Sequence, residues 1–231
     1  MSDARRDIFA RLRGGCIDAP AASIDAEREA LGSGLPPSPP AEELCEAFLR
    51  NVLRNRGTID CAQHRNATVD AVRRFLHDTY RSQRLVAGND PRLAALPWRD
   101  AGLLPRFGSL EDGEPVALSY ARLGIAELGA VLTTTGKSNP AVNNLLPQHH
   151  IVLLDVEDLV PAMEQAWERL ALTDPKLRTR GVNIIAGPSS TADIGGQLVY
   201  GAHGPIGWHV ILLGEVPDGA LERALSSQPG A

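Results

Sequence analysis

Apolar residues along the chain recur with helical spacing in some segments and form short continuous runs in others. Residues 41–56 carry two adjacent apolar rows at four-residue spacing, which predicts a helix with a broad buried face. Residues 67–81 and 156–171 show the same period, and each predicts a further helix. Between the helices lie apolar runs with the length and composition of strands. These runs are 58–62, 84–87, 115–120, 130–134, 150–154, 182–186, 197–200 and 209–213.

The order of these elements predicts the fold class. Strands alternate with helices, and the strand runs are largely apolar throughout. Because strands of that kind are buried on both faces, we expect a mostly parallel sheet with helices on both sides, a three-layer α/β/α fold. In open sheets of this class, ligands bind outside the carboxyl ends of the strands. We therefore expect the loops at 133–139 and 187–194 and the segment around His203 to line one crevice.

The first 40 residues differ in composition from the rest. Residues 3–13 predict a short amphipathic helix. Residues 14–40 are rich in Gly, Pro, Ala and Ser, which is typical of a linker. We therefore expect an N-terminal helical extension with a linker over residues 1–40 and one main domain over residues 41–231.

Composition and charge argue against several classes of protein. The chain has 231 residues, 43% of them hydrophobic, and a net charge of −5, so no basic surface for nucleic acid is expected. No apolar run approaches the ~20 residues of a membrane span, and no apolar signal segment follows the N-terminal charges, which favours a cytoplasmic protein. The three cysteines, Cys16, Cys45 and Cys61, are too few and too dispersed to hold an iron–sulfur cluster. His and Cys spacings typical of a metal site do not occur, so we expect neither a metal nor a cofactor.

Small and polar residues concentrate in the segment that follows the strand at 182–186. Ser189 and Thr191 supply hydroxyl groups, and Gly187 allows the backbone to approach a ligand closely. Asp193 lies at the expected start of a helix, where N-capping is the competing explanation for these residue types. A strand, a Gly-Pro-Ser loop and a helix start can together direct backbone N–H groups at an anion.

Two further groups complete the expected site for a small anion. His203 and Gly204 lie in a Gly-Ala-His-Gly-Pro segment that can turn sharply. Thr135 and Gly136 form a polar turn after the strand at 130–134. We expect both groups to face the same crevice as the 187–194 loop.

Three ordered blocks of sequence carry a resemblance to a known family. The last block reads GPSSTADI at 187–194, followed by GAHGP at 201–205 and HVILL at 209–213. Upstream, GIAELGAVL at 124–132 and LLPQHHIVLL at 145–154 match in the same order. The chain is therefore similar to the lactate-utilisation protein C family, the proteins of the LUD domain.

The resemblance implies a fold, a function and partners. LUD proteins resemble the NagB/RpiA/CoA-transferase-like group of three-layer α/β/α sheets. The implied role is that of a soluble subunit of an L-lactate utilisation system, supporting oxidation of L-lactate to pyruvate with iron–sulfur partner subunits. An alternative is a free-standing enzyme acting on a small phosphorylated or acyl substrate. Its acid and base candidates are Glu127, Asp193 and His203, with Glu127 suggested by analogy to the nucleophilic glutamate of CoA transferases.

Overall fold

The computed structural model describes residues 3–15, 20–32, 43–170, 179–192 and 197–228. The chain divides into two compact units, Met1–Ser38 and Pro39–Ala231.

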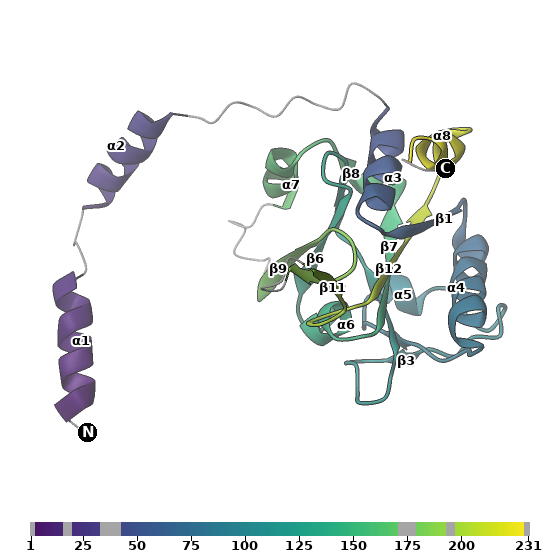
Figure 1. Cartoon of the computed structure of the whole chain (residues 1–231), viewed down its shortest axis with the longest axis horizontal. Coiled ribbons are helices and arrows are strands. Elements are labelled where there is room, and N and C mark those ends of the chain that lie inside the picture. The colour runs from purple at the N-terminus through teal and green to yellow at the C-terminus, as the bar shows by residue number, and fades with distance from the viewer. Residues whose placement is uncertain (1–2, 16–19, 33–42, 171–178, 193–196, 229–231) are drawn as a thin grey trace. The chain divides into compact units, whose positions relative to one another are not determined.

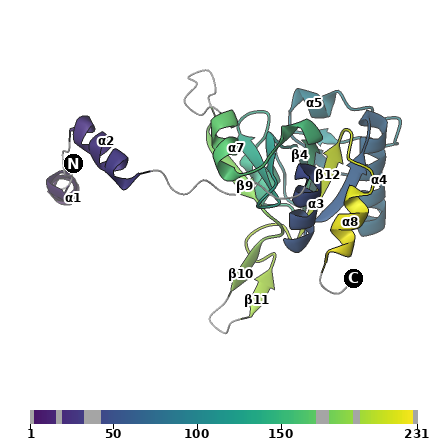
Figure 2. The same ribbon diagram turned by 90° about the horizontal axis from the view of Figure 1, so that it is seen from above.

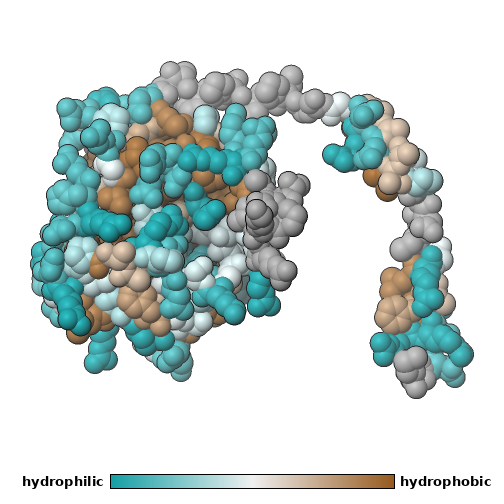
Figure 3. All heavy atoms as spheres, turned by 180° about the vertical axis from the view of Figure 1, so that it is seen from behind, coloured by the Kyte–Doolittle hydropathy of each residue, from teal (hydrophilic) through white to brown (hydrophobic). Residues whose placement is uncertain are grey.

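The first unit holds two helices, α1 (Asp3–Gly15) and α2 (Ala21–Leu31). Helix α2 lies inside the segment expected to be linker, so that expectation is wrong for these residues. The reason is local, because AASIDAEREAL is built largely of strong helix formers and follows Pro20 at the N-cap. Both helices expose apolar side chains, seen as brown spheres in Figure 3.

The second unit is built on a six-stranded sheet in the order β1-β12-β7-β4-β2-β3 (Figure 1). Every neighbouring pair in this sheet is parallel. The longest register joins β7 and β12, in which His149 pairs with Gly207 and Asp155 with Leu213. The strands are β1 (Thr58–Ala62), β2 (Val86–Ala87), β3 (Arg106–Phe107), β4 (Val116–Tyr120), β7 (His149–Asp155) and β12 (Gly207–Leu213).

Helices cover both faces of this sheet. Alternate residues of β7 point to opposite sides, so Ile151 and Leu153 enter one core while Val152 and Leu154 enter the other. The first core also contains α4 (Arg65–Tyr80) and α5 (Pro91–Ala94), and the second contains α3 (Leu44–Arg54) and α8 (Ala220–Ser226). The predicted three-layer α/β/α fold with a mostly parallel sheet is therefore confirmed.

A second sheet of four strands, in the order β8-β5-β6-β9, was not expected. Apolar residues of this sheet pack on α7 (Met163–Leu170) in a third core. The helix predicted over 156–171 is therefore wrong in its first half, because Leu159 and Val160 pair with β5 and Pro161 precedes the helix. The elements are β5 (Leu123–Ile125), β6 (Ala130–Thr135), α6 (Ala141–Leu145), the 3-10 turn η1 (Val156–Asp158), β8 (Leu159–Val160) and β9 (Gly181–Ile185).

The helix expected after the 187–194 loop is also wrong for the residues described there. Strand β10 (Ser190–Ala192) pairs antiparallel with β11 (Leu198–Tyr200), forming a hairpin that projects from the body of this unit (Figure 2). Ser190 and Thr191 are therefore paired strand residues. They lie opposite Tyr200 and Val199 of β11, residue types that favour strands.

No helix among the described residues is long and apolar enough to cross a membrane.

Candidate functional site

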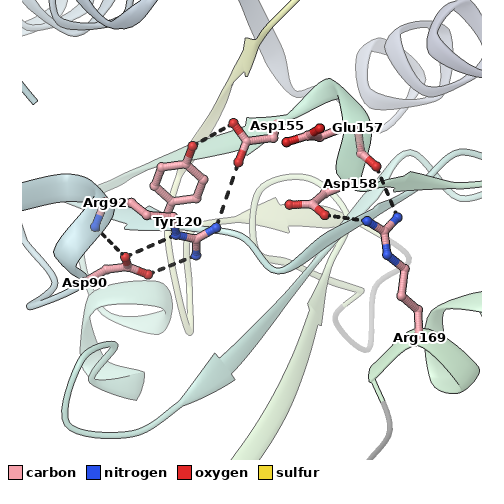
Figure 4. A network of polar contacts seen from close by, with 7 residues as sticks. All are labelled: Asp90, Arg92, Tyr120, Asp155, Glu157, Asp158 and Arg169. Atoms are coloured by element: carbon pink, nitrogen blue, oxygen red, sulfur yellow. Dashed lines mark hydrogen bonds and ion pairs between the residues drawn. The ribbon is translucent and has the colours of Figure 1, made fainter. Parts of the chain in front are cut away.

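The carboxyl ends of the parallel strands carry a network of charged and aromatic side chains (Figure 4). Strand β4 ends at Tyr120, β7 ends at Asp155, and Asp90 follows β2 by three residues. The Tyr120 hydroxyl donates a hydrogen bond to Oδ1 of Asp155 over 2.8 Å. Burial raises the pKa of Tyr120, and the hydrogen bond to Asp155 raises it further, so the phenol stays protonated. The network therefore lies at the edge of the sheet where ligands of such folds bind.

Arg92 is held in this network from three sides. Its guanidinium lies 3.8 Å from the centroid of the Tyr120 ring, a cation–π arrangement. It donates to Asp90 through Nε over 3.2 Å and Nη2 over 3.0 Å, and Nη1 lies 3.9 Å from Oδ2 of Asp155. Asp90 also accepts from the backbone N–H of Arg92 and so caps α5. Burial acts to lower the pKa of Arg92, but its bonds and proximity to Asp90 outweigh burial and raise it.

A second ion pair lies beside the first. Nη2 of Arg169, on α7, lies 2.7 Å from Oδ1 of Asp158, and Nη1 donates to the carbonyl of Glu157 over 3.1 Å. Burial raises the pKa of Asp158, although the charge of Arg169 opposes this shift. Asp158 therefore binds a proton more readily than an ordinary carboxyl group. Its ion pair with Arg169 fixes its position.

A cavity of about 260 Å³ lies between these two ion pairs. Arg122, on the connection between β4 and β5, contributes an exposed side chain to its wall. Within the described part of the chain, the Arg122 guanidinium has no hydrogen-bond or ion-pair partner. The lining residues are Arg92, Arg122, Leu123, Asp158, Arg169 and Leu170.

A second cavity of about 540 Å³ lies along the same edge, at the ends of β1, β7 and β12. Asp155 lies between the two cavities. Its carboxylate faces Tyr120 and Arg92, of which Arg92 lines the first cavity, and Asp155 itself lines the second. The lining residues are Gln63, His64, Arg65, Asp155, Val156, Glu157, Leu213, Gly214 and Glu215. The first cavity is lined by more cations than carboxylates, and the second by more carboxylates than cations, so only the first suits an anion.

The base of the β10–β11 hairpin brings together three of the residues predicted from sequence. The Ser189 N–H donates to the carbonyl of Pro205, and the Ser189 carbonyl accepts from Gly201, both over 2.8 Å. Gly204 is packed so closely that an added Cβ would lie 3.0 Å from the Cβ of Ser189. Gly187 has a φ of 95°, and an added Cβ would lie 2.2 Å from the carbonyl oxygen of Asn55. These close approaches serve chain packing, because the groups they bring together are main-chain and side-chain atoms of the protein itself.

The remaining predicted residues are dispersed. Thr135 pairs with Gly181 at the start of β9, whereas Gly187 follows the end of that antiparallel strand. The Thr135–Gly136 turn and residues 187–189, which follow β9, therefore lie at opposite ends of the strand pair, so these two described groups do not line one crevice. Thr191 lies within β10, and His203 is exposed in the segment after β11.

Glu127 has a structural partner. Its Oε1 accepts a hydrogen bond from the backbone N–H of Met163 over 2.8 Å, at the first residue of α7. A carboxylate at this position stabilises a helix N-terminus. Asp193 lies outside the described residues.

Sequence reasoning missed the carboxyl-edge network, although part of its signal was present. Tyr120 and Asp155 are the last residues of two apolar strands, and Asp90 closely follows a third. Polar residues directly after parallel strands are the positions at which ligands meet an open sheet. The signal for Arg122 and Arg169 was absent, because what brings them to this edge is the second sheet, which the sequence did not predict: Arg122 directly precedes β5, and the predicted helix that carries Arg169 packs on this sheet.

Comparisons with known proteins agree with this architecture. Residues 115–213 match the model of the LUD domain. The Lactate utilization protein C of Exiguobacterium sp. (strain ATCC BAA-1283 / AT1b) is 30% identical over 175 residues, covering 71% of this chain and 75% of that protein. The Lactate utilization protein C of Halalkalibacterium halodurans is 34% identical over 93 residues, and that match spans 40% of the relative's length.

A solved structure shares the fold. The crystal structure of a DUF162 family protein from Deinococcus radiodurans superposes with a TM-score of 0.55 at 18% sequence identity. The similarity covers 74% of this chain and 96% of that chain. With a relative at 30% identity over three quarters of its length, the chain belongs to the lactate utilization protein C family of LUD-domain proteins.

Proposed function

We propose that this protein is the substrate-handling subunit of an L-lactate utilisation system and supports the oxidation of L-lactate to pyruvate. The observation that carries the proposal is family membership, since relatives bear the name Lactate utilization protein C. The carboxyl-edge cavity supports it physically, because guanidinium groups bind carboxylates in a planar, two-bond geometry.

The reaction requires a partner that takes up electrons. Conversion of lactate to pyruvate breaks one C–H and one O–H bond and releases two electrons and two protons. The chain has three cysteines, one fewer than the four thiolates that hold a typical iron–sulfur cluster. Burial raises the pKa of Cys45 to about 12 and that of Cys61 to about 11, so both stay as thiols near neutral pH. We therefore assign electron transfer to iron–sulfur partner subunits and substrate handling to this chain.

Two sites compete for that role within the chain. One is the carboxyl-edge cavity, with Asp158 as its acid or base candidate. The other is the site predicted from sequence around His203 and Ser189, with Glu127 and Asp193 as further candidates. His203→Ala tests the second site without touching the first.

The function is tested by growth on L-lactate as sole carbon source. A bacterial strain lacking its own lactate utilization protein C should grow when this chain is supplied, and should grow equally on pyruvate with or without it. The purified chain should oxidise L-lactate only after cysteine-rich iron–sulfur subunits of the same system are added. Failure to restore growth despite normal expression would contradict the proposal.

A free-standing enzyme for a small phosphorylated or acyl substrate is the second candidate function. The arginine-lined cavity is the observation that favours it, since guanidinium groups also bind phosphate. Turnover of such a substrate by the purified chain alone would support this candidate and remove the need for partner subunits.

A further inference from the structure

We propose that Arg92, Arg122 and Arg169 form a binding site for a small monocarboxylate, with Arg122 as the residue that recruits it and Asp158 as the residue that selects it. The inference deepens the proposed function, and rests on it only for the choice of L-lactate as the first probe.

Recruitment falls to Arg122 because, among the residues that the structure describes, none forms an ion pair with it. Arg92 is bound by Asp90 and lies near Asp155, and Arg169 is bound by Asp158. Arg122 lines the same cavity, and its guanidinium has no such partner in the described regions of the chain. A carboxylate that enters the cavity could form an ion pair with Arg122 directly. At Arg92 or Arg169 it would have to compete with an existing ion pair.

The size of the cavity points to a small ligand. At about 260 Å³ it is smaller than the roughly 300–1,000 Å³ of sites for drug-sized molecules. Leu123 and Leu170, each 3% exposed, supply apolar wall beside the charged groups. A ligand with one charged end and a short apolar end matches both parts of this lining.

The carboxylate of Asp158 favours a ligand that carries a single negative charge. Its carboxylate lines the cavity and keeps a lone-pair surface beyond the bond to Arg169 (Figure 4). A doubly charged phosphate would be repelled by it, whereas a hydroxyl group next to a carboxylate can donate a hydrogen bond to it. A 2-hydroxy monocarboxylate therefore satisfies Arg122 and Asp158 together.

The test measures binding to the purified full chain by isothermal titration calorimetry. The probes are L-lactate, acetate and inorganic phosphate, titrated at low and constant ionic strength. We expect L-lactate to bind more tightly than acetate, and both more tightly than phosphate. Arg122→Gln should weaken L-lactate binding about ten- to hundredfold, the loss expected for one charged hydrogen-bonded pair.

Matched variants separate this site from general electrostatics. Arg73→Gln removes the same charge from an exposed ion pair with Asp70 on α4 and should leave the affinity within about twofold. Arg122→Lys keeps the charge but loses the fork geometry, so its affinity should lie between wild type and Arg122→Gln. Asp158→Asn should reduce the ratio of L-lactate affinity to phosphate affinity, and its melting curve shows whether the variant stays folded.

Equal weakening by Arg122→Gln and Arg73→Gln would overturn the site, as would tighter binding of phosphate than of L-lactate. These outcomes are distinguishable from failure of the proposed function. Normal growth on L-lactate with unaltered binding in Arg122→Gln refutes the site alone. Arg122-dependent carboxylate binding by a chain that does not restore growth refutes the function alone.

Discussion

The carboxyl edge of the six-stranded sheet and the base of the β10–β11 hairpin are both rich in polar groups, but they use them differently. At the hairpin base, Ser189 satisfies both of its backbone groups within the chain, and its neighbouring glycines are there for close packing. At the carboxyl edge, side chains from β4, β7, α5 and α7 hold one another around cavities. Arg122 borders one of these cavities with its charge unpaired in the described structure.

The difference shows that a polar, glycine-rich stretch of sequence is an ambiguous signal. Such residues satisfy the needs of a tight hairpin as well as those of a ligand. Long charged side chains held half-buried by several elements are harder to explain by packing alone, because fixing them costs side-chain entropy and desolvation. The comparison predicts that changes at the packed glycines of the hairpin base alter stability, whereas changes to the charged groups that line the carboxyl-edge cavity alter binding.

The largest expected effect is on stability at the hairpin base. Gly187→Ala forces a side chain into a backbone with φ of 95° and against the carbonyl of Asn55. We expect the free energy of unfolding to fall by about 2–4 kcal/mol in chemical denaturation, from backbone strain and overpacking together. Gly136→Ala is the matched control, since an added Cβ there meets nothing within 4 Å, and it should change stability by less than about 1 kcal/mol. A stable Gly187→Ala protein that has lost carboxylate binding would reverse the assignment of the two regions.

A second prediction concerns the imidazoles of the six-stranded sheet, away from its carboxyl ends. Burial lowers the pKa of His209 to about 4, with Asp60 opposing and Arg74 and His149 adding to this shift. Between the ordinary value of 6.5 and about 4, the unfolded chain binds a proton that the folded chain does not. Stability due to neutral His209 is therefore complete above pH 6.5 and is lost as the pH falls through this window, by about 3 kcal/mol.

Denaturation curves between pH 4 and pH 7 measure this loss. His209→Gln should reduce the number of protons taken up on unfolding by up to one, and so flatten the pH dependence of stability. An unaltered pH slope in His209→Gln would show that other groups, such as the buried imidazole of His150, cause the acid sensitivity, since burial lowers the pKa of His150 to about 3.

A third prediction compares one tyrosine from each region. Tyr120→Phe removes the hydrogen bond to Asp155 but keeps the ring beneath Arg92, so unfolding free energy should fall by about 1 kcal/mol. Tyr200→Phe, in β11, keeps the stacking of its ring on Arg56 and should change stability by less than about 0.5 kcal/mol. Equal effects of the two substitutions in urea denaturation would remove the energetic distinction between the regions.

The smallest effect is expected for Ser189→Ala. Both hydrogen bonds that the structure places at this residue are made by its backbone, so we expect a change within about 0.5 kcal/mol and unaltered L-lactate affinity. His203→Ala should behave in the same way in calorimetry. If either variant abolished growth on L-lactate while remaining folded, the hairpin base would be the functional site and the carboxyl edge would not.

Much of the fold could be predicted from the sequence. The strands at 58–62, 150–154 and 209–213 lie where their apolar runs place them. The last two are largely or wholly buried in the sheet, whereas the first, at the sheet edge, is mostly half-buried. Burial leaves a signal inside a single segment, and this signal needs no knowledge of the neighbouring strands. The family resemblance followed from the same C-terminal segments.

The second sheet could not be predicted in this way. Strand β8 has two residues and β5 has three, too short to show a period, and both lie beside segments that also suit a helix. The pairing of Leu159 and Val160 with β5 is a tertiary contact that overrides the helical spacing of the following residues. The same limit applies to the three-residue strand β10, whereas its partner β11 lies in the run at 197–200 that was predicted as a strand.

The sequence by itself determined which residues are buried, and hence that the chain forms a parallel sheet covered on both faces. Only the tertiary structure decided which polar residues meet. Four residues of the network are Asp90, Tyr120, Asp155 and Arg169, and successive members are 14 to 35 residues apart in the sequence. They converge because crossover connections bring the ends of β2, β4 and β7 to one edge of the sheet, and because the second sheet places α7 beside that edge. The burial of apolar residues is encoded in their spacing within one segment. The convergence of polar residues from distant segments depends on the order of the strands in the sheet and on the direction in which each strand runs.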